Sequence, residues 1–200
     1  MKKILIVCLL FGIMAFQALW ILCQEGQTLA WDIQFLKGKA QGSISDFQTI
    51  TVESGDELHI AISPVLDSFC YVLIQNSERK ITVLHDKSIK SGNDTIIDLI
   101  RVDDSPGTKT LYVIMSMARQ TKLEDLINRY KSNPRSQRYA NNLHGEIAGL
   151  QETVSGLGEP VSVIIPTGGT TRGTVQEYAT RFSGKNLYVR AITIHVTPAR

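Results

Sequence analysis

Two apolar runs separated by a short polar segment constrain the fold of this 200-residue chain more than any other feature. Residues 69–74 read Phe-Cys-Tyr-Val-Leu-Ile, and residues 80–85 read Lys-Ile-Thr-Val-Leu-His. Two β-prone runs that flank a few polar residues predict a β-hairpin. Because the first run is apolar at every position, it needs cover on both faces, and we expect it in the interior of a sheet.

Seven further segments have the alternation or the apolar density of strands. They are residues 29–37, 47–52, 58–63, 95–102, 110–117, 160–165 and 186–196, whereas residues 175–183 have a mixed character. Turn residues separate several of them, most clearly Asp-Asp-Ser-Pro-Gly at 103–107. About nine short strands and one helical interruption predict a mainly β fold, an antiparallel β-sandwich with a two-helix insertion packed on one flank. We expect residues 24–200 to form this single domain.

The spacing of apolar residues changes to a helical period after residue 120. Thr121 followed by Glu124 has the form of a capping box, and it predicts a helix at about 122–131. Asn133 as a cap and Pro134 in the first turn predict a second helix at about 134–155. The second helix carries an apolar stripe of Ala140, Leu143, Ile147, Leu150 and Val154. We expect this stripe to cover a face of the sheet, with a partner helix as the alternative.

The N-terminus has the layout of a secretory signal. Lys2 and Lys3 precede residues 4–23, which are apolar except for Gln17. We therefore expect residues 1–23 to be a signal peptide of a bacterial protein exported to the periplasm or cell surface. An uncleaved membrane anchor is one alternative. Lipidation at Cys23 is a weaker one, because Leu22 stands where lipoprotein signals have a small residue.

Charge and cysteine content exclude some partners. The chain has 21 Lys and Arg against 19 Asp and Glu, so removal of Lys2 and Lys3 leaves 19 of each. This balance lacks the excess of basic residues that is typical of nucleic-acid-binding proteins. We expect membrane contact only through the N-terminal segment. Cys70 is the one cysteine beyond residue 23, so no internal disulfide can form, and its apolar run predicts a buried thiol.

No familiar catalytic or metal-binding motif is present in the sequence. His59, His85, His144 and His195 are not spaced as zinc ligands, so we expect no metal and no cofactor. The one candidate ligand loop contains Gly168, Gly169, Arg172 and Gly173. Backbone N–H groups of such loops can cradle an anion, and an arginine would add charge. The segment lacks the lysine of a phosphate-binding loop.

Five segments together have the pattern of a known family: residues 52–58, 67–72, 81–84, 106–107 and 111–116. The chain resembles the bacterial family catalogued as domain of unknown function 4384 over roughly residues 29–130. Residues 180–190 are similar to the segment that lies C-terminal to that domain in some members. A Phe-Pro pair often comes after the second hairpin strand in the family, whereas His85-Asp86 occupies that place here. The resemblance implies an exported β-rich accessory or ligand-binding module without a settled activity.

We therefore expect a non-enzymatic binding or scaffolding module whose partners are other envelope proteins or an unidentified ligand. Its site would lie on loops at residues 86–93 or 168–173, because a rigid sheet can present variable loops. The alternative is an envelope hydrolase, in which His59, His85 or His195 would meet an acid and a nucleophile in a cleft.

Overall fold

The structure of the chain is a computed structural model that describes residues 29–37, 49–54, 57–101, 106–154, 158–165 and 177–198. The expected signal or anchor segment at 1–23 and the glycine-rich loop at 168–173 lie outside these residues. Within them, no helix is both long enough and apolar enough to cross a membrane.

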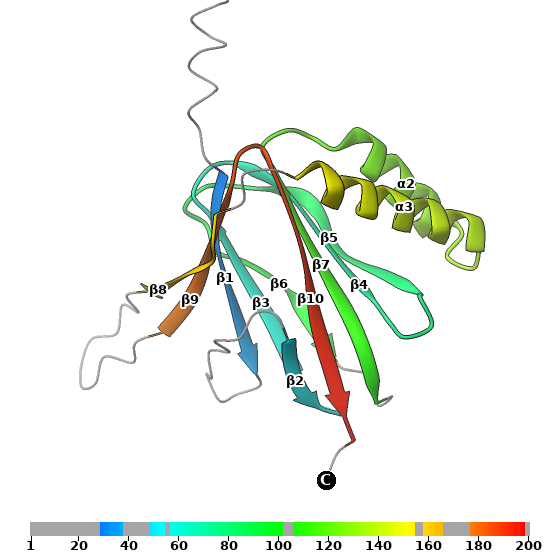
Figure 1. Cartoon of the computed structure of the whole chain (residues 1–200), viewed down its shortest axis with the longest axis horizontal. Coiled ribbons are helices and arrows are strands. Elements are labelled where there is room, and N and C mark those ends of the chain that lie inside the picture. Colours follow the sequence, from blue (N-terminus) through cyan, green and yellow to red (C-terminus); the bar gives the residue numbers. More distant parts are fainter. Residues whose placement is uncertain are drawn as a thin grey trace, which may run out of the picture.

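Ten strands in the described residues form two five-stranded sheets that pack face to face (Figure 1). Sheet A has the order β6-β3-β1-β9-β8, with β6 (Thr95–Arg101), β3 (Glu57–Pro64), β1 (Leu29–Lys37), β9 (Glu177–Gly184) and β8 (Val161–Ile165). Sheet B has the order β2-β10-β7-β4-β5, with β2 (Thr49–Glu53), β10 (Leu187–Thr197), β7 (Gly107–Ser116), β4 (Ser68–Gln75) and β5 (Ile81–Ile89). Neighbouring strands are antiparallel except β2, which is parallel to β10. The predicted β-sandwich with a helical insertion is confirmed.

Alternating residues of the strands fill the space between the sheets. In β1, Leu29, Trp31, Ile33 and Phe35 are fully buried, as their spacing predicted. Asp32 points to the opposite face, where Arg181 binds it with two hydrogen bonds of 2.8 Å. The core between the sheets is therefore apolar, and the outer face of sheet A is polar at this position.

The predicted hairpin forms, and its first strand is covered on both faces. β4 lies between β7 and β5. Cys70 and Val72 belong to the core between the sheets, whereas Tyr71 and Leu73 belong to a second apolar cluster on the other face of sheet B. Burial raises the pKa of the Cys70 thiol far above its usual range, so this cysteine is an inert core residue.

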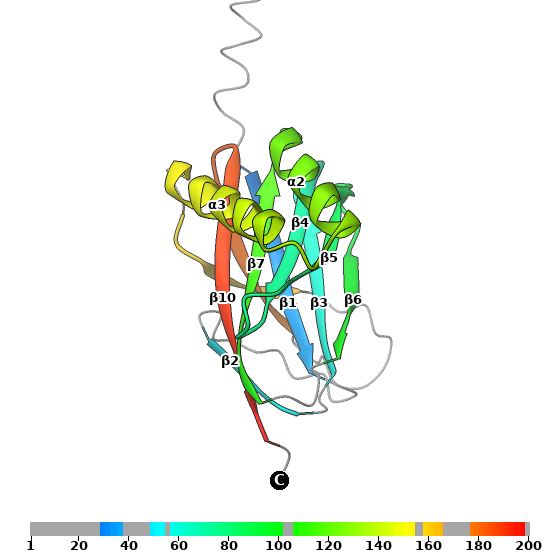
Figure 2. The ribbon, with the colours of Figure 1, turned by 90° about the vertical axis from the view of Figure 1, so that its right-hand side faces the viewer.

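Helices α2 (Thr121–Ser132) and α3 (Gln137–Thr153) cover part of the outer face of sheet B (Figure 2). Leu123 and Ile127 of α2 and Leu143 and Ile147 of α3 are buried against Leu73 and its neighbours. The predicted role of the apolar stripe, cover for a sheet face, is confirmed. The second apolar cluster is thus the interface between sheet B and the helices.

The start of α2 differs from the predicted capping box. Gln120 occupies the cap position, and no side chain caps the helix. Glu124 instead accepts hydrogen bonds from Tyr71 Oη at 2.8 Å and Arg119 Nε at 2.6 Å. Burial raises the pKa of Tyr71 to about 12, so its phenol stays protonated and can donate to Glu124. The predicted capping box was wrong because the side chain of Glu124 binds Tyr71 of the sheet and does not reach back to the start of the helix.

The second helix begins at Gln137 and not at residue 134. Asn133 closes α2, since its N–H donates to the carbonyl oxygens of Arg129 and Tyr130. Ser136 caps α3 by accepting a hydrogen bond from the N–H of Tyr139. Asn and Ser are comparable caps, so local sequence did not distinguish the two positions.

Residues 86–93 are not the loop that the sequence predicted. β5 continues to Ile89 because β4 begins at Ser68 and pairs with it along this length. Only the segment from Lys90 to Asp94 connects β5 to β6. Lys90 Nζ and the N–H of Ser91 both donate to Asp67, and these bonds lower the pKa of its carboxyl. The predicted binding loop is therefore part of strand β5 up to Ile89, followed by a short turn that hydrogen bonds to Asp67 hold in place.

One hydroxyl fixes α2 to the start of β5. The buried Tyr130 Oη accepts a hydrogen bond from the N–H of Ile81 at 3.2 Å and donates to the carbonyl oxygen of the same residue at 2.9 Å. We expect Tyr130→Phe to lower the free energy of unfolding by about 1–3 kcal/mol, because two buried backbone groups lose their partner. Urea unfolding measures the change. Tyr139→Phe is the matched control, since no hydrogen bond of the Tyr139 hydroxyl is found within the described residues, and an equal loss in both variants would contradict the prediction.

Candidate functional site

The helices leave part of the outer face of sheet B uncovered. Figure 2 shows the lower ends of β10, β7 and β2 outside the helical layer. Strand pairing brings side chains into two rows across this area: Thr49, Thr193 and Thr110 in one, and Thr51, His195 and Thr108 in the other. We call these six residues the threonine–histidine face.

Strand alternation explains why these side chains point outward. Ile50 in β2 and Ile192 and Ile194 in β10 are buried in the core, so the residues between them face solvent. Thr49, Thr51, Thr108 and His195 are exposed, and Thr110 and Thr193 are half-buried. Strand spacing places neighbouring side chains about 4.8 Å apart across strands and about 6.8 Å apart along them. The face is therefore a flat grid of hydroxyl groups and one imidazole, and the adjoining row places Thr197 beside Glu53.

One pair on this face has the residue types of a nucleophile and its base. His195 Nδ1 lies 3.1 Å from Thr108 Oγ1. A hydrolytic site of this kind also needs a third group that orients the imidazole, and a cleft that holds the substrate. Among the residues that the structure describes, no carboxylate is bonded to His195, and the pair is exposed. The arrangement supplies hydrogen-bonding groups but not a complete triad.

The other histidines lie elsewhere. His59 alternates with the buried Leu58 and Ile60, so it points outward from sheet A, on the opposite side of the sandwich from His195. His85 lies on β5. His144 on α3 places its Nε2 3.1 Å from the carbonyl oxygen of Arg79. The fold therefore does not bring His59, His85 and His195 into one site.

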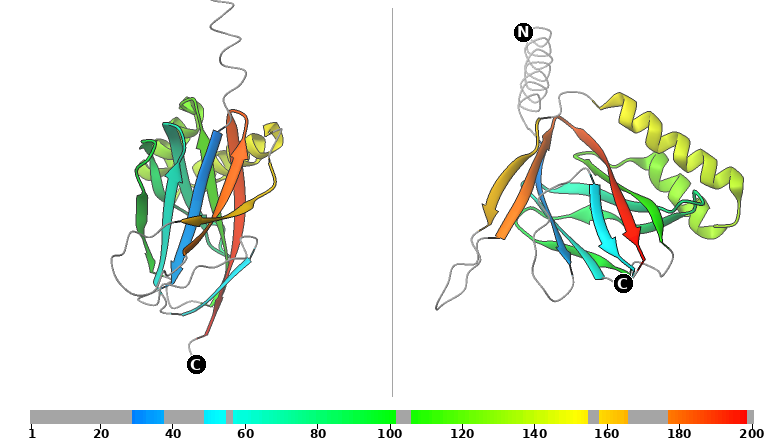
Figure 3. Two further views of the ribbon diagram at one scale, coloured as in Figure 1. Left: turned by 90° about the vertical axis from the view of Figure 1, so that its left-hand side faces the viewer. Right: turned by 60° about the horizontal axis from the view of Figure 1, so that its bottom comes forward.

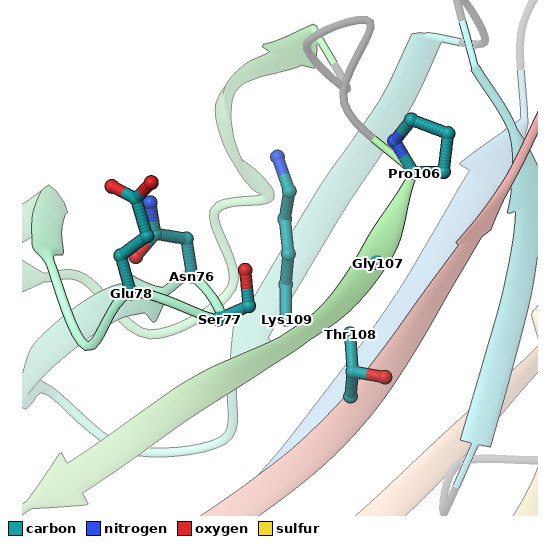
Figure 4. Close-up of a pocket in the computed structure, with 7 residues that line it drawn as sticks. All are labelled: Asn76, Ser77, Glu78, Pro106, Gly107, Thr108 and Lys109. Carbon is teal, nitrogen blue, oxygen red and sulfur yellow. The ribbon is translucent and has the colours of Figure 1, made fainter.

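A hollow of about 220 Å³ lies beside the threonine–histidine face (Figure 4). Asn76, Ser77 and Glu78 from the β4–β5 turn line one side, and residues 106–109 line the other. In Figure 4, Thr108 points away from Lys109 and toward β10, so this threonine joins the hollow to the face.

The hollow is shaped by a tight turn. Asn76 Oδ1 accepts from the N–H of Lys80, and Arg79 takes a left-handed conformation with φ of 63°. The lining groups are an amide, hydroxyls, a carboxylate and an ammonium group. Cofactor pockets are usually larger and mostly apolar. The hollow fits water molecules or one small polar group, and we assign no cofactor to it.

The sequence-predicted site residues contribute little to this area. Gly168, Gly169, Arg172 and Gly173 lie outside the described residues. In the described part of the chain, no three His, Cys, Asp or Glu side chains are grouped as a metal site. The threonine–histidine face was not among the predicted sites, and its only trace in the sequence is the Thr-x-Thr spacing at 49–51 and 108–110.

Comparisons with known proteins add nothing to this geometry. No family model matches the chain, and neither a curated protein nor a solved structure matches it. The resemblance to domain of unknown function 4384 remains a prediction.

Proposed function

We propose that the protein is a non-enzymatic binding module of the bacterial cell envelope and that the threonine–histidine face is its contact surface. The observation that carries the proposal is the pair of aligned rows on three strands of a rigid sandwich. Exposed polar side chains held on strands keep their spacing, so a partner can bind them at little cost in conformational entropy. The proposed location in the envelope rests on the N-terminal sequence.

The chemistry of the face defines the partner. Hydroxyl groups donate and accept hydrogen bonds, and a neutral imidazole does both. A face of five hydroxyl groups and one imidazole favours a partner that presents hydroxyl or amide groups, on an envelope protein or another envelope component. Water is displaced from both surfaces, so each lost hydrogen bond must be replaced across the interface.

Charge introduced on both sides of His195 should strongly weaken binding. We expect the double substitution Thr51→Lys and Thr108→Lys to lower retention on immobilised envelope extract by about tenfold or more, because two ammonium groups would have to lose their hydration. Thr82→Lys is the matched control, since Thr82 is an exposed threonine on β5 away from the face. The proposal fails if the unmodified protein is not retained, or if the double variant is retained as well as the control.

The contact between His195 and Thr108 supports a second candidate function, a hydrolase that uses this pair. His195→Ala separates the two functions. A hydrolytic activity that is lost in both His195→Ala and Thr108→Val would favour the hydrolase. The binding module would be favoured if the unmodified protein shows no hydrolytic activity and His195→Ala is retained less well on envelope extract.

A further inference from the structure

Three of the four strands at the edges of the sheets have features that oppose pairing with another chain. β5 contains a register irregularity and carries Asp86 and Lys87. β6 lies beside β5, and its pairing with β3 is also irregular. β2 ends in a charged residue, Glu53. Bulges, charges and short length are the usual devices that keep sheet edges from associating.

β8 has fewer of these protections. Its sequence, Val161-Ser162-Val163-Ile-Ile, contains no charge, its nearest prolines are the flanking residues 160 and 166, and it pairs with β9 without a register shift. Val161 is 57% exposed, which places it among the few large apolar side chains that the described residues leave in solvent. The strand is short, but its free edge is both apolar and regular.

β8 also lies away from the other sheet. In Figures 1 and 3, β8 and β9 project from the side of the molecule opposite the helices, and β8 packs mainly on β9. Among the described strands β9 is its one neighbour, so the other edge of β8 is unpaired there, and an apolar strand with an unpaired edge is a template for strand addition.

We propose that β8 pairs with β8 of a second copy of the chain, antiparallel about a two-fold axis, so that two copies of sheet A form one continuous ten-stranded sheet. A two-fold axis perpendicular to the sheet pairs residues that point to the same face. Full overlap of the five residues then places Val163 opposite Val163 of the second copy, and Val161 opposite residue 165.

The uniform chemistry of β8 favours a second copy over a different protein. Specific pairing with a different strand usually depends on complementary charges or polar groups, and β8 offers only Ser162. When two copies of β8 pair with each other, apolar residues lie opposite apolar residues at most positions, because the two strands have the same sequence. The proposal is independent of the threonine–histidine face, which lies on sheet B.

The size of the contact predicts a weak dimer. Five paired residues extend over about 17 Å, and a contact of this length buries less than the roughly 1,200–2,000 Å² of a stable interface. We therefore expect association that depends on concentration, with a dissociation constant on the order of micromolar.

Cysteine cross-linking tests the register directly. Cys8 and Cys23 are replaced by serine in the full chain, and Cys70 remains because it is buried. Directly opposite Cα atoms lie about 4.5–5.5 Å apart, within disulfide range, so Val163→Cys should give a disulfide-linked dimer under mild oxidation. In the same register two copies of Val161→Cys would lie about 13 Å apart and should not cross-link. Equal cross-linking of both variants, cross-linking of neither, or a disulfide to a different protein would overturn the proposal.

Sedimentation of the full chain in a mild detergent provides a measurement without cysteine substitutions. The average protein mass measured by sedimentation should rise from that of a monomer toward that of a dimer over about a hundredfold increase in protein concentration around the micromolar range. Val163→Lys should remain a single copy throughout, because it places two ammonium groups face to face. A single copy at all concentrations for the unmodified chain, or association that Val163→Lys leaves unchanged, would overturn the proposal.

Discussion

Truncation of Leu73 to alanine is expected to lower the free energy of unfolding by about 2–5 kcal/mol. Leu73 is fully buried on β4, and its neighbours in the ladder are Val83 of β5 and Tyr112 of β7. Its side chain packs in the cluster that joins sheet B to α2 and α3. Alanine would leave a cavity between the sheet and the helices, because the close-packed side chains around it relax only partly into the space.

Denaturant unfolding followed by circular dichroism measures this loss. Val65→Ala is the control, because Val65 is 46% exposed in the turn after β3 and its truncation should change stability by less than about 0.5 kcal/mol. If Leu73→Ala cost no more than Val65→Ala, the helices would not depend on this contact with the sheet.

The features that were predictable from the sequence are those that local periodicity reports. The uniform apolarity of residues 69–74 predicted a strand with two covered faces, and the core and the helices provide those covers. The alternation of β1 predicted the buried side of that strand residue by residue. Periodicity succeeds here because each side chain contacts one layer only, so burial repeats with the geometry of the element.

Features that depend on distant partners were not predictable in this way. β5 extends past His85 only because Ser68 and Phe69 of β4 offer a backbone to pair with. The threonine–histidine face exists because β2 pairs in parallel with β10, two strands far apart in the sequence. No local signal specifies such a register, so the aligned rows could not be inferred from Thr-x-Thr spacing alone.

The start of α3 was missed for a different reason. Asn133, Pro134 and Ser136 are all favoured at helix starts, and the choice among them depends on where α2 ends. The backbone N–H of Asn133 bonds to the last turn of α2, which leaves Ser136 as the cap. Three residues within four positions could each have started the helix, and the point at which α2 ends determined which of them did.

Replacement of Trp31 by alanine is expected to cost about 3–5 kcal/mol of unfolding free energy. Trp31 is the largest fully buried side chain at the centre of an aromatic cluster in the sandwich. Its ring stacks on Phe182 with centroids 4.8 Å apart and meets Tyr188 edge-on at 5.2 Å. These contacts join β1, β9 and β10, so the cavity would lie where the two sheets meet.

Replacement of Trp31 by phenylalanine should cost much less, below about 1.5 kcal/mol, although it also removes volume. The indole Nε1 is buried and has no hydrogen-bond partner among the described residues, and a buried donor without a partner costs free energy. Phenylalanine removes that unsatisfied donor and keeps a ring that can stack on Phe182. Parallel urea titrations of the two variants measure the difference. A phenylalanine variant as unstable as the alanine variant would show that the indole N–H contributes a stabilising interaction, and that the cluster depends on the indole rather than on aromatic packing.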